Sequence, residues 1–590
     1  MLFASFDFLL FAVPVILAFW ALRSYPAVRT LVLLLASYFF YMASARPPEG
    51  AISPPWYFAG LLVASTFLDY FASLRIHRRT PELGSSDPAV AAAARRSRNT
   101  WLWISLVGNL GLLGYFKYAD FFMSATIDIL RAVLPGSFGD AVAPALAPIL
   151  PIGISFYTFQ SLSYTIDVWR QRLTPEPNFR KFALFVVFFP QLVAGPIVRA
   201  NEFLPQLHRR PRVRPDEIEW ALFRIFKGLI KKVVLGDFIA VYFIDIVFDS
   251  PGDYTSLENL LALYGFTLQI YADFSGYSDI AIGVAKLMGF EMPENFDRPY
   301  QARDVGEFWR RWHMTLSTWL RDYLFFPLGG SKGSNLRTYF NLWLTMFLVG
   351  MWHGASWNFV IYSNLQGGAV LFNRWNRLRS RSAVWTMLLW GLVLPVFAGV
   401  VYGFGLLVID LDVGKAATLA GIAAAVFALI VLLPDPPRKP GETKGRWLTP
   451  IHVLLTFHFA TLTRVFFRAE DFERAKLMIH KLLAFEPHGV REGLFRIQGL
   501  HDWLHEQFAD AAASEALWFT ALDRLVEWGL LILLAAGIAY HFTPRRWIDE
   551  LFASRFCKLP GPVLGVVFAA VCLLLMHLLD GPRANIYFAF

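Results

Sequence analysis

The stretch Phe308-Trp-Arg-Arg-Trp-His313-Met-Thr-Leu-Ser317, with Gly350-Met-Trp-His353-Gly-Ala further along, places two histidines in a chain that is otherwise strongly apolar. An ionisable group at the depth of a lipid bilayer costs about 3 kcal/mol or more, so it usually has a function or lines a water-filled cavity. A neutral imidazole can lie there without a full charge and still accept a proton near pH 7. His313 and His353 are therefore the first candidates for a functional site.

Composition predicts an all-α polytopic membrane protein. Of the 590 residues, 56% are hydrophobic and only 17% are charged, and the apolar stretches recur along nearly the whole chain. We therefore predict a single membrane domain over residues 1–590, surrounded by membrane lipid. The net charge of +9 is interpreted as a topology signal. Basic residues do not alternate with aromatic ones as on a nucleic-acid surface, so no nucleic-acid partner is expected.

About twelve spans are predicted from the apolar segments and the basic loops between them. Lys and Arg collect in cytoplasmic loops, and their alternation with neutral or acidic loops places both termini on the periplasmic side. The segment 468–516 then becomes an extracytoplasmic loop. The predicted spans lie near residues 2–22, 30–45, 56–74, 101–123, 147–169, 233–248, 259–289, 384–409, 415–433, 449–467, 517–541 and 561–580.

Two further apolar stretches, 182–198 and 339–372, each lie between two basic loops and cannot be ordinary single spans. The first contains Pro190 and Pro196, and the second contains Gly350 and Gly354 beside the histidine. Irregular backbone at membrane depth is tolerated only where protein or water surrounds it. We therefore predict re-entrant or broken helices that line an internal cavity reached from the cytoplasmic side.

The segment 298–337 is rich in tryptophan and should lie along the membrane or dip into it. His313 and Ser317 are four residues apart and are expected to share one helix face, with Arg321 and Asp322 following. We predict that Trp312, Ser317, Trp352 and Asp322 line the cavity together with His353. A cavity-lining His353 would contribute little to packing.

Two other groups of polar residues are interpreted as structural. Asp273 and Asp279 lie in an apolar span, where neighbouring hydroxyl groups could satisfy them. His501 and His505 have the spacing of a helical zinc motif, but Asp502 replaces the glutamate of that motif and no third ligand is evident. No bound metal is therefore predicted.

The chain resembles the bacterial membrane-bound O-acyltransferases, in particular their alginate O-acetylation branch. The resemblance covers residues 2 to about 470 and the C-terminus, and it implies a funnel-shaped helical fold. It also implies that His353 is catalytic, with His313 close to it. The motifs that carry it are Phe308-Trp-Arg-Arg-Trp-His313-x-x-Leu-Ser317-x-Trp-Leu-Arg-Asp-Tyr, Met351-Trp352-His353-Gly354-Ala355, Tyr271-Ala-Asp273-Phe-Ser-Gly276-Tyr-Ser-Asp279 and Phe189-Pro-Gln191-Leu-x-Ala-Gly195-Pro196-Ile.

Acyl transfer from a thioester to a hydroxyl needs a base, a geometry that holds both reactants, and exclusion of water. We hypothesise that His353 is the base and that His313 assists it or positions the donor. The alternative is that both histidines are core residues hydrogen-bonded to the backbone. No tightly bound cofactor is expected, because acetyl-CoA or a similar thioester would be the donor substrate.

The resulting interpretation is an enzyme of the bacterial inner membrane that passes an acetyl group outward for O-acetylation of an exported polysaccharide. The resemblance implies a periplasmic acyltransferase partner that completes the transfer. Transfer of D-alanine from a carrier protein to teichoic acid is the alternative within the class. A proton-coupled transporter is the alternative outside it, although the sequence shows no internal repeats of the kind that transporters carry.

The C-terminal segment Asn585-Ile-Tyr587-Phe-Ala-Phe590 is an aromatic tail beyond the last predicted span. A phenolic oxygen can accept an acyl group and pass it on. Tyr587 is therefore a candidate acyl relay on the outer side, and the alternative is a simple anchor at the membrane interface.

Overall fold

The computed structural model describes residues 3–44, 55–133, 151–378, 392–433, 446–486, 489–491, 493–509, 512, 516–544, 546–548, 553–556, 558–563 and 565–566. Every regular element in these ranges is a helix. The predicted all-α class is thereby confirmed. Residues 567–590, with most of the last predicted span and with Tyr587, lie outside the described part of the chain.

The helices vary from single turns to a helix of 46 residues. They are α1 (Phe6–Ala21), α2 (Pro26–Ser44), α3 (Pro55–Arg78), α4 (Pro88–Val133), α5 (Ile154–Trp169), α6 (Phe179–Val187), α7 (Ala200–Leu207), α8 (Pro215–Ile230), α9 (Asp245–Asp249), α10 (Ser256–Leu287), α11 (Val305–Arg311), α12 (Met314–Leu320), α13 (Asn335–His353), α14 (Trp357–Leu378), α16 (Leu394–Leu407), α17 (Val413–Leu432), α18 (Thr449–Thr463), α19 (Val465–Arg468), α20 (Phe472–Leu482), α21 (Gln498–Gln507), α23 (Leu517–Glu527), α24 (Gly529–Phe542) and α25 (Ala553–Phe556). Three π-helical segments, η3 (Lys231–Phe238), η4 (Ala240–Ile244) and η7 (Arg321–Phe325), continue α8 and α12.

Short polar side chains fix where the helices of the core begin. Thr255 and Glu258 form a capping box at the start of α10, in which each side chain accepts the other's backbone N–H. Asp304 caps α11 and Ser334 caps α13 in the same way, each accepting a backbone N–H three residues on. The capped ends satisfy N–H groups that no residue of the same helix can satisfy.

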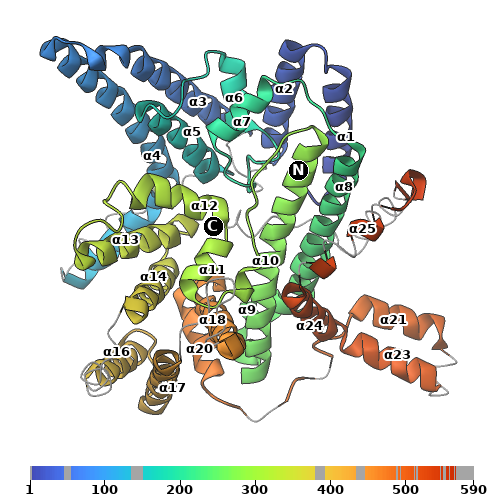
Figure 1. Cartoon of the computed structure of the whole chain (residues 1–590). Helices are drawn as coiled ribbons and strands as arrows, with labels where there is room; N and C mark the ends of the chain where they lie inside the picture. The colour runs from blue at the N-terminus through green and yellow to red at the C-terminus, as the bar shows by residue number, and fades with distance from the viewer. Residues whose placement is uncertain are drawn as a thin grey trace.

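Helix α10 is the centre of the fold and is buried along most of its length. Figure 1 shows it running through the middle of the molecule, with α1 to α7 at one end and α18, α20 and α24 around the other. Helix α8 packs against it so closely that a Cβ on Gly228 would lie 2.7 Å from the carbonyl oxygen of Gly276. Small residues at such crossings allow helix backbones to touch, as membrane helix pairs require.

Asp273 and Asp279 of α10 have cationic partners, which the sequence analysis did not predict. Asp279 forms ion pairs with Arg224 and Lys231, both at 2.9 Å, and Asp273 pairs with Lys232 at 2.5 Å. All five side chains are buried. Paired burial of this kind is required because an isolated charge would be strongly destabilising, and it ties α8 and η3 to α10.

The helical structure is interrupted within both stretches that the sequence predicts to be irregular. Helix α6 ends at Val187 and is followed by a fully buried turn, while α13 and α14 are separated by Gly354–Ser356. Helices α13 and α14 lie antiparallel, because Gly350 approaches Ser363 while Gly367 approaches Met346.

By length and composition, four described helices could cross a membrane, or five if a bent pair is counted as one span. Each predicted span up to residue 541 coincides with one or more helices. Several of these helices are short or kinked, so the count of twelve stays a prediction. The multi-pass helical architecture itself agrees with the sequence.

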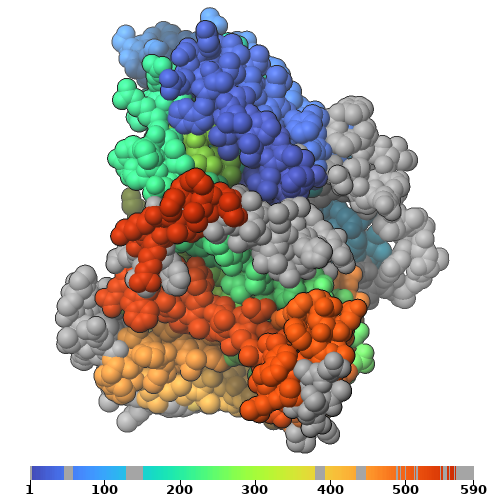
Figure 2. All heavy atoms as spheres, turned by 90° about the vertical axis from the view of Figure 1, so that its right-hand side faces the viewer, coloured from blue at the N-terminus to red at the C-terminus, as the bar shows by residue number. Residues whose placement is uncertain are grey.

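The predicted span 517–541 consists of two helices and is not one straight helix. The chain bends by 64° between α23 and α24. Helix α23 packs against α21 through Leu504, Phe519 and Val526, so the predicted loop 468–516 also contains helical structure. Figure 1 shows α21 and α23 projecting side by side from the body, and Figure 2 shows them, in orange, at the surface.

Candidate functional site

His353 is the last residue of α13 and is only 3% exposed. Its ring packs edge-on against Trp352 at 4.9 Å and Phe467 at 5.1 Å between ring centroids. Gly354 follows directly, and a Cβ there would lie 2.1 Å from the ring of Phe359. The glycine therefore allows the chain to turn sharply after the histidine, beneath an aromatic ring of α14.

Two residues of α4 hold the end of α13 that carries His353. The Tyr118 hydroxyl donates to the carbonyl of Met351 at 3.0 Å. The Lys117 ammonium donates to the carbonyl of Trp352 and lies 3.5 Å from that of His353. The last carbonyls of a helix lack intrahelical partners and carry its negative dipole end, which a cation stabilises. Sequence analysis missed Lys117, although a lysine within the predicted span 101–123 was a usable signal.

His313 lies between α11 and α12 with a left-handed backbone, at φ 43°. Its Nδ1 is 3.0 Å from Oδ1 of Asn295, which also accepts the backbone N–H of Thr315 at 3.3 Å. A backbone N–H can only donate, so this atom of Asn295 is the oxygen and His313 Nδ1 carries the proton. In that tautomer Nε2 is the basic nitrogen. The expected shared helix face of His313 and Ser317 is wrong, because α12 begins only at Met314.

Trp352 contacts both histidines. The centroid of its ring system is 4.9 Å from the ring of His353 and 5.9 Å from that of His313. Phe156 and Phe159 pack on the same indole at 5.7 and 5.9 Å. The structure thus brings the two sequence-predicted histidines to one buried, aromatic-walled place that water can enter only with difficulty.

The other residues predicted to line the cavity lie in different surroundings. Trp312 stacks on Phe308 at 5.7 Å and lies beneath the guanidinium of Arg464 at 5.1 Å. The Ser317 hydroxyl donates to the backbone carbonyl of Trp309 at 2.8 Å. Asp322 is 30% exposed and pairs with Arg199 at 3.4 Å and Arg321 at 2.8 Å. These contacts link Trp312 to an aromatic cluster and Asp322 to a surface ion-pair group.

A polar cavity of about 210 Å³ approaches His313 from the side of α8, η3 and α24. Asn295 belongs both to its wall and to the hydrogen bond with His313. Arg224, Lys227 and Lys231 contribute cationic groups to the same wall. Sequence analysis missed this cavity, because its walls come from segments more than 200 residues apart.

This arrangement is suited to proton transfer in a dry site. An imidazole whose Nδ1 donates to a fixed acceptor keeps one tautomer and one orientation, and its Nε2 can accept a proton. The imidazole of His353 contacts the same indole as His313, so two basic groups lie in one buried region. A hydroxyl and an electrophilic carbonyl held there would be shielded from water.

Comparison with known proteins places this chain among acyl-transferring membrane enzymes. The sequence profile of the membrane-bound O-acyltransferase family matches residues 66–400. A protein of Azotobacter vinelandii named probable alginate O-acetylase AlgI is 40% identical over 371 residues, which are 62% of this chain and 67% of that relative.

A protein of the same name from Pseudomonas putida is 35% identical over 477 residues, covering 80% of this chain and 88% of the relative. A peptidoglycan O-acetyltransferase of Helicobacter pylori is 34% identical over 389 residues, covering 61% and 67%. The names of all three relatives therefore refer to O-acetylation, of alginate in two cases and of peptidoglycan in the third.

Proposed function

The chain belongs to the membrane-bound O-acyltransferase family, and from that premise we propose that it passes an acetyl group from a cytoplasmic thioester across the inner membrane for O-acetylation of an exported polysaccharide. The observation that supports this proposal best is the pair of buried histidines that both contact Trp352. Membership of the family favours acyl transfer over the transporter interpretation. Acetyl is favoured over D-alanyl by the names of the relatives at 34% identity and above.

In the proposed chemistry, His353 is the general base and His313 holds or assists the donor. The imidazole of His353 takes the proton of the accepting hydroxyl while that oxygen attacks the thioester carbonyl. The carbon–sulfur bond then breaks, and the thiolate leaves with the proton returned by the imidazole. The rings of Trp352, Phe156 and Phe159 exclude the water that would hydrolyse the thioester.

The acetyl donor that we propose is acetyl-CoA or a similar thioester, and the partner is a periplasmic acyltransferase that completes the transfer. The test uses proteoliposomes with acetyl-CoA inside and the polysaccharide outside. Ester-linked acetyl on the polymer should appear only when both this chain and the periplasmic enzyme are present. In the cell, deletion should remove acetyl esters from the polymer. Loss of D-alanyl esters instead would support the alternative donor, and no change in either ester would contradict the proposal.

We also propose a topology with about twelve spans, both termini in the periplasm and the basic loops in the cytoplasm. Contacts between the cytoplasmic ends of distant helices support it. The Trp20 indole at the end of α1 donates to the carbonyl of Leu287 at the end of α10, at 3.0 Å. After replacement of the native cysteines, single cysteines at Ser97 and Val213 should both be protected from an impermeant thiol reagent in intact cells. Labelling of the second alone would mean that 182–198 crosses the membrane.

A further inference from the structure

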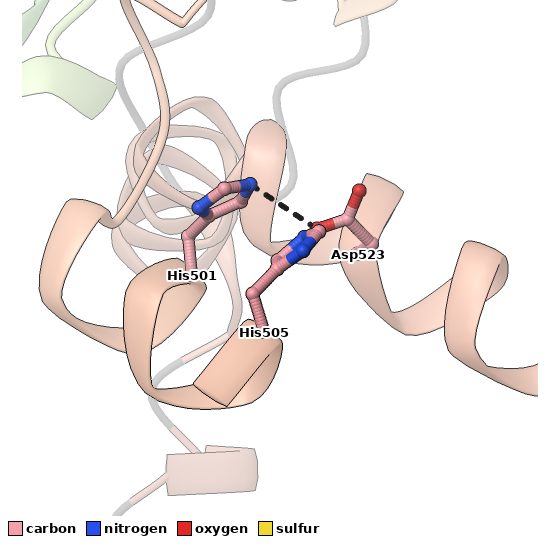
Figure 3. A group of neighbouring side chains, drawn as sticks. All are labelled: His501, His505 and Asp523. Carbon is pink, nitrogen blue, oxygen red and sulfur yellow. Dashed lines mark hydrogen bonds and ion pairs between the residues drawn. The ribbon is translucent and has the colours of Figure 1, made fainter. Parts of the chain in front are cut away.

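The hairpin of α21 and α23 carries a cluster of metal-binding groups. His501 and His505 are one helical turn apart on α21, and their rings lie 4.2 Å from each other. Asp523 on α23 faces both, and Figure 3 shows the two imidazoles and the carboxylate converging. Asp523 is the third ligand that was not evident from the sequence, because it follows 18 residues later on another helix.

The distances within this cluster match those of a small tetrahedral ion. Oδ1 of Asp523 is 2.9 Å from Nε2 of His505 and 3.4 Å from Nε2 of His501. The ligand atoms of the three residues all lie within 4.8 Å of one another. Two ligands bound at about 2.0 Å to a tetrahedral zinc ion are roughly 3.3 Å apart. Only small side-chain adjustments would therefore be needed.

A second carboxylate orients one of the imidazoles. Oδ1 of Asp502 accepts Nδ1–H of His501 at 3.3 Å and the amide of Gln498 at 2.7 Å. A histidine that donates its other ring N–H to a carboxylate keeps the tautomer that metal binding needs, which is the usual arrangement around protein-bound zinc.

We propose that His501, His505 and Asp523 bind one zinc ion that joins α21 to α23. Imidazole nitrogens with a single carboxylate favour zinc over magnesium or calcium, which prefer oxygen ligands. Three protein ligands leave one position for water. His505 is 40% exposed and Asp523 is 31% exposed, so an ion can reach the site from solvent.

A metal ion that joins the two helices would stabilise the hairpin. Its helices are 10 and 11 residues long, a length at which isolated helices are marginal in water. The buried apolar residues between them, within the described part of the chain, form a small cluster of Leu504, Phe519 and Val526. The site lies beyond residues 66–400, the part that matches the family profile. It is therefore independent of the proposed acyl transfer.

The test measures metal binding by the full chain in detergent after removal of metals with a chelator. Titration with zinc should give one tightly bound ion per chain, and cobalt should give the intense visible absorption of a tetrahedral complex. His505→Asn should abolish both signals. Asp502→Asn should weaken zinc binding by about tenfold, as expected for a residue that orients a ligand.

The matched control is His458→Asn, a half-buried histidine of α18 that hydrogen-bonds to the carbonyl of Leu454, and it should bind zinc as the wild type does. Limited proteolysis of the wild-type chain should also cleave the hairpin faster without zinc, which requires no variant. Absence of a stoichiometric zinc ion in the wild type, or equal binding by His505→Asn, would overturn the proposal and leave only a His–Asp ion-pair cluster.

Discussion

Replacement of His353 by glutamine should lower the acetyl-transfer rate by at least about 100-fold, the lower range for loss of a general base. The protein should still be present in the membrane at wild-type level, because glutamine fills much of the volume of the imidazole. The measurement is ester-linked acetyl on the exported polysaccharide, normalised to the amount of membrane-inserted protein. Full acetylation by the variant would eliminate His353 as the base.

The structure favours His353→Gln over His353→Ala as the test of this role. The sequence suggested that His353 contributes little to packing, and that expectation is wrong, since the side chain is 3% exposed between Trp352 and Phe467. His353→Ala would leave a void worth roughly 2 kcal/mol or more, so lost activity could reflect lost protein. The control is His452→Gln, another buried histidine, whose Nδ1 lies 3.0 Å from the carbonyl of Leu448 and which is remote from Trp352 in sequence and contacts. It should keep its activity.

Local patterns explain why much of the fold was predictable. Apolar segments of helical length and the capping residues beside them depend only on neighbouring residues, and these segments coincide with helices up to residue 541. Both breaks, after Val187 and after His353, coincide with proline and glycine positions. The bend between α23 and α24 was not predicted, although Gly529 lies at it, where a Cβ would be 2.5 Å from the side chain of Ile497.

The candidate site was predictable in its two histidines and in Trp352, which belong to long motifs. Its supporting residues were not, since they come from distant segments. Asn295 reaches His313 from the chain after α10, and Lys117 reaches α13 across 235 residues. Hydrogen bonds between such positions depend on tertiary packing, which no local pattern reports. For the same reason, Asp523 could not be recognised as a third ligand from the spacing of the two histidines on α21.

Lys117→Met is expected to give the second largest loss, although Lys117 is part of neither motif. Its ammonium donates to the carbonyl of Trp352 and lies 5.6 Å from the centroid of that indole. Methionine keeps the length of the side chain and removes the donor, so the carbonyls at the end of α13 lose their partner. An unsatisfied buried carbonyl costs about 1–3 kcal/mol. Part of that cost should appear as displacement of His353.

We expect kcat to fall by about tenfold, equivalent to 1.4 kcal/mol, with little change in KM for the thioester. Lys117→Arg should retain more activity than Lys117→Met, because it keeps a cationic donor. Tyr118→Phe is the matched control: its hydroxyl donates to the carbonyl of Met351 at 3.0 Å, one residue further from the catalytic end. It should lower kcat less. A stable Lys117→Met enzyme with unchanged kcat would contradict a role of Lys117 in positioning His353. Equal losses of kcat in Lys117→Met and Tyr118→Phe would also contradict it, because a positioning effect should be larger for the hydrogen bond that is lost closer to the imidazole.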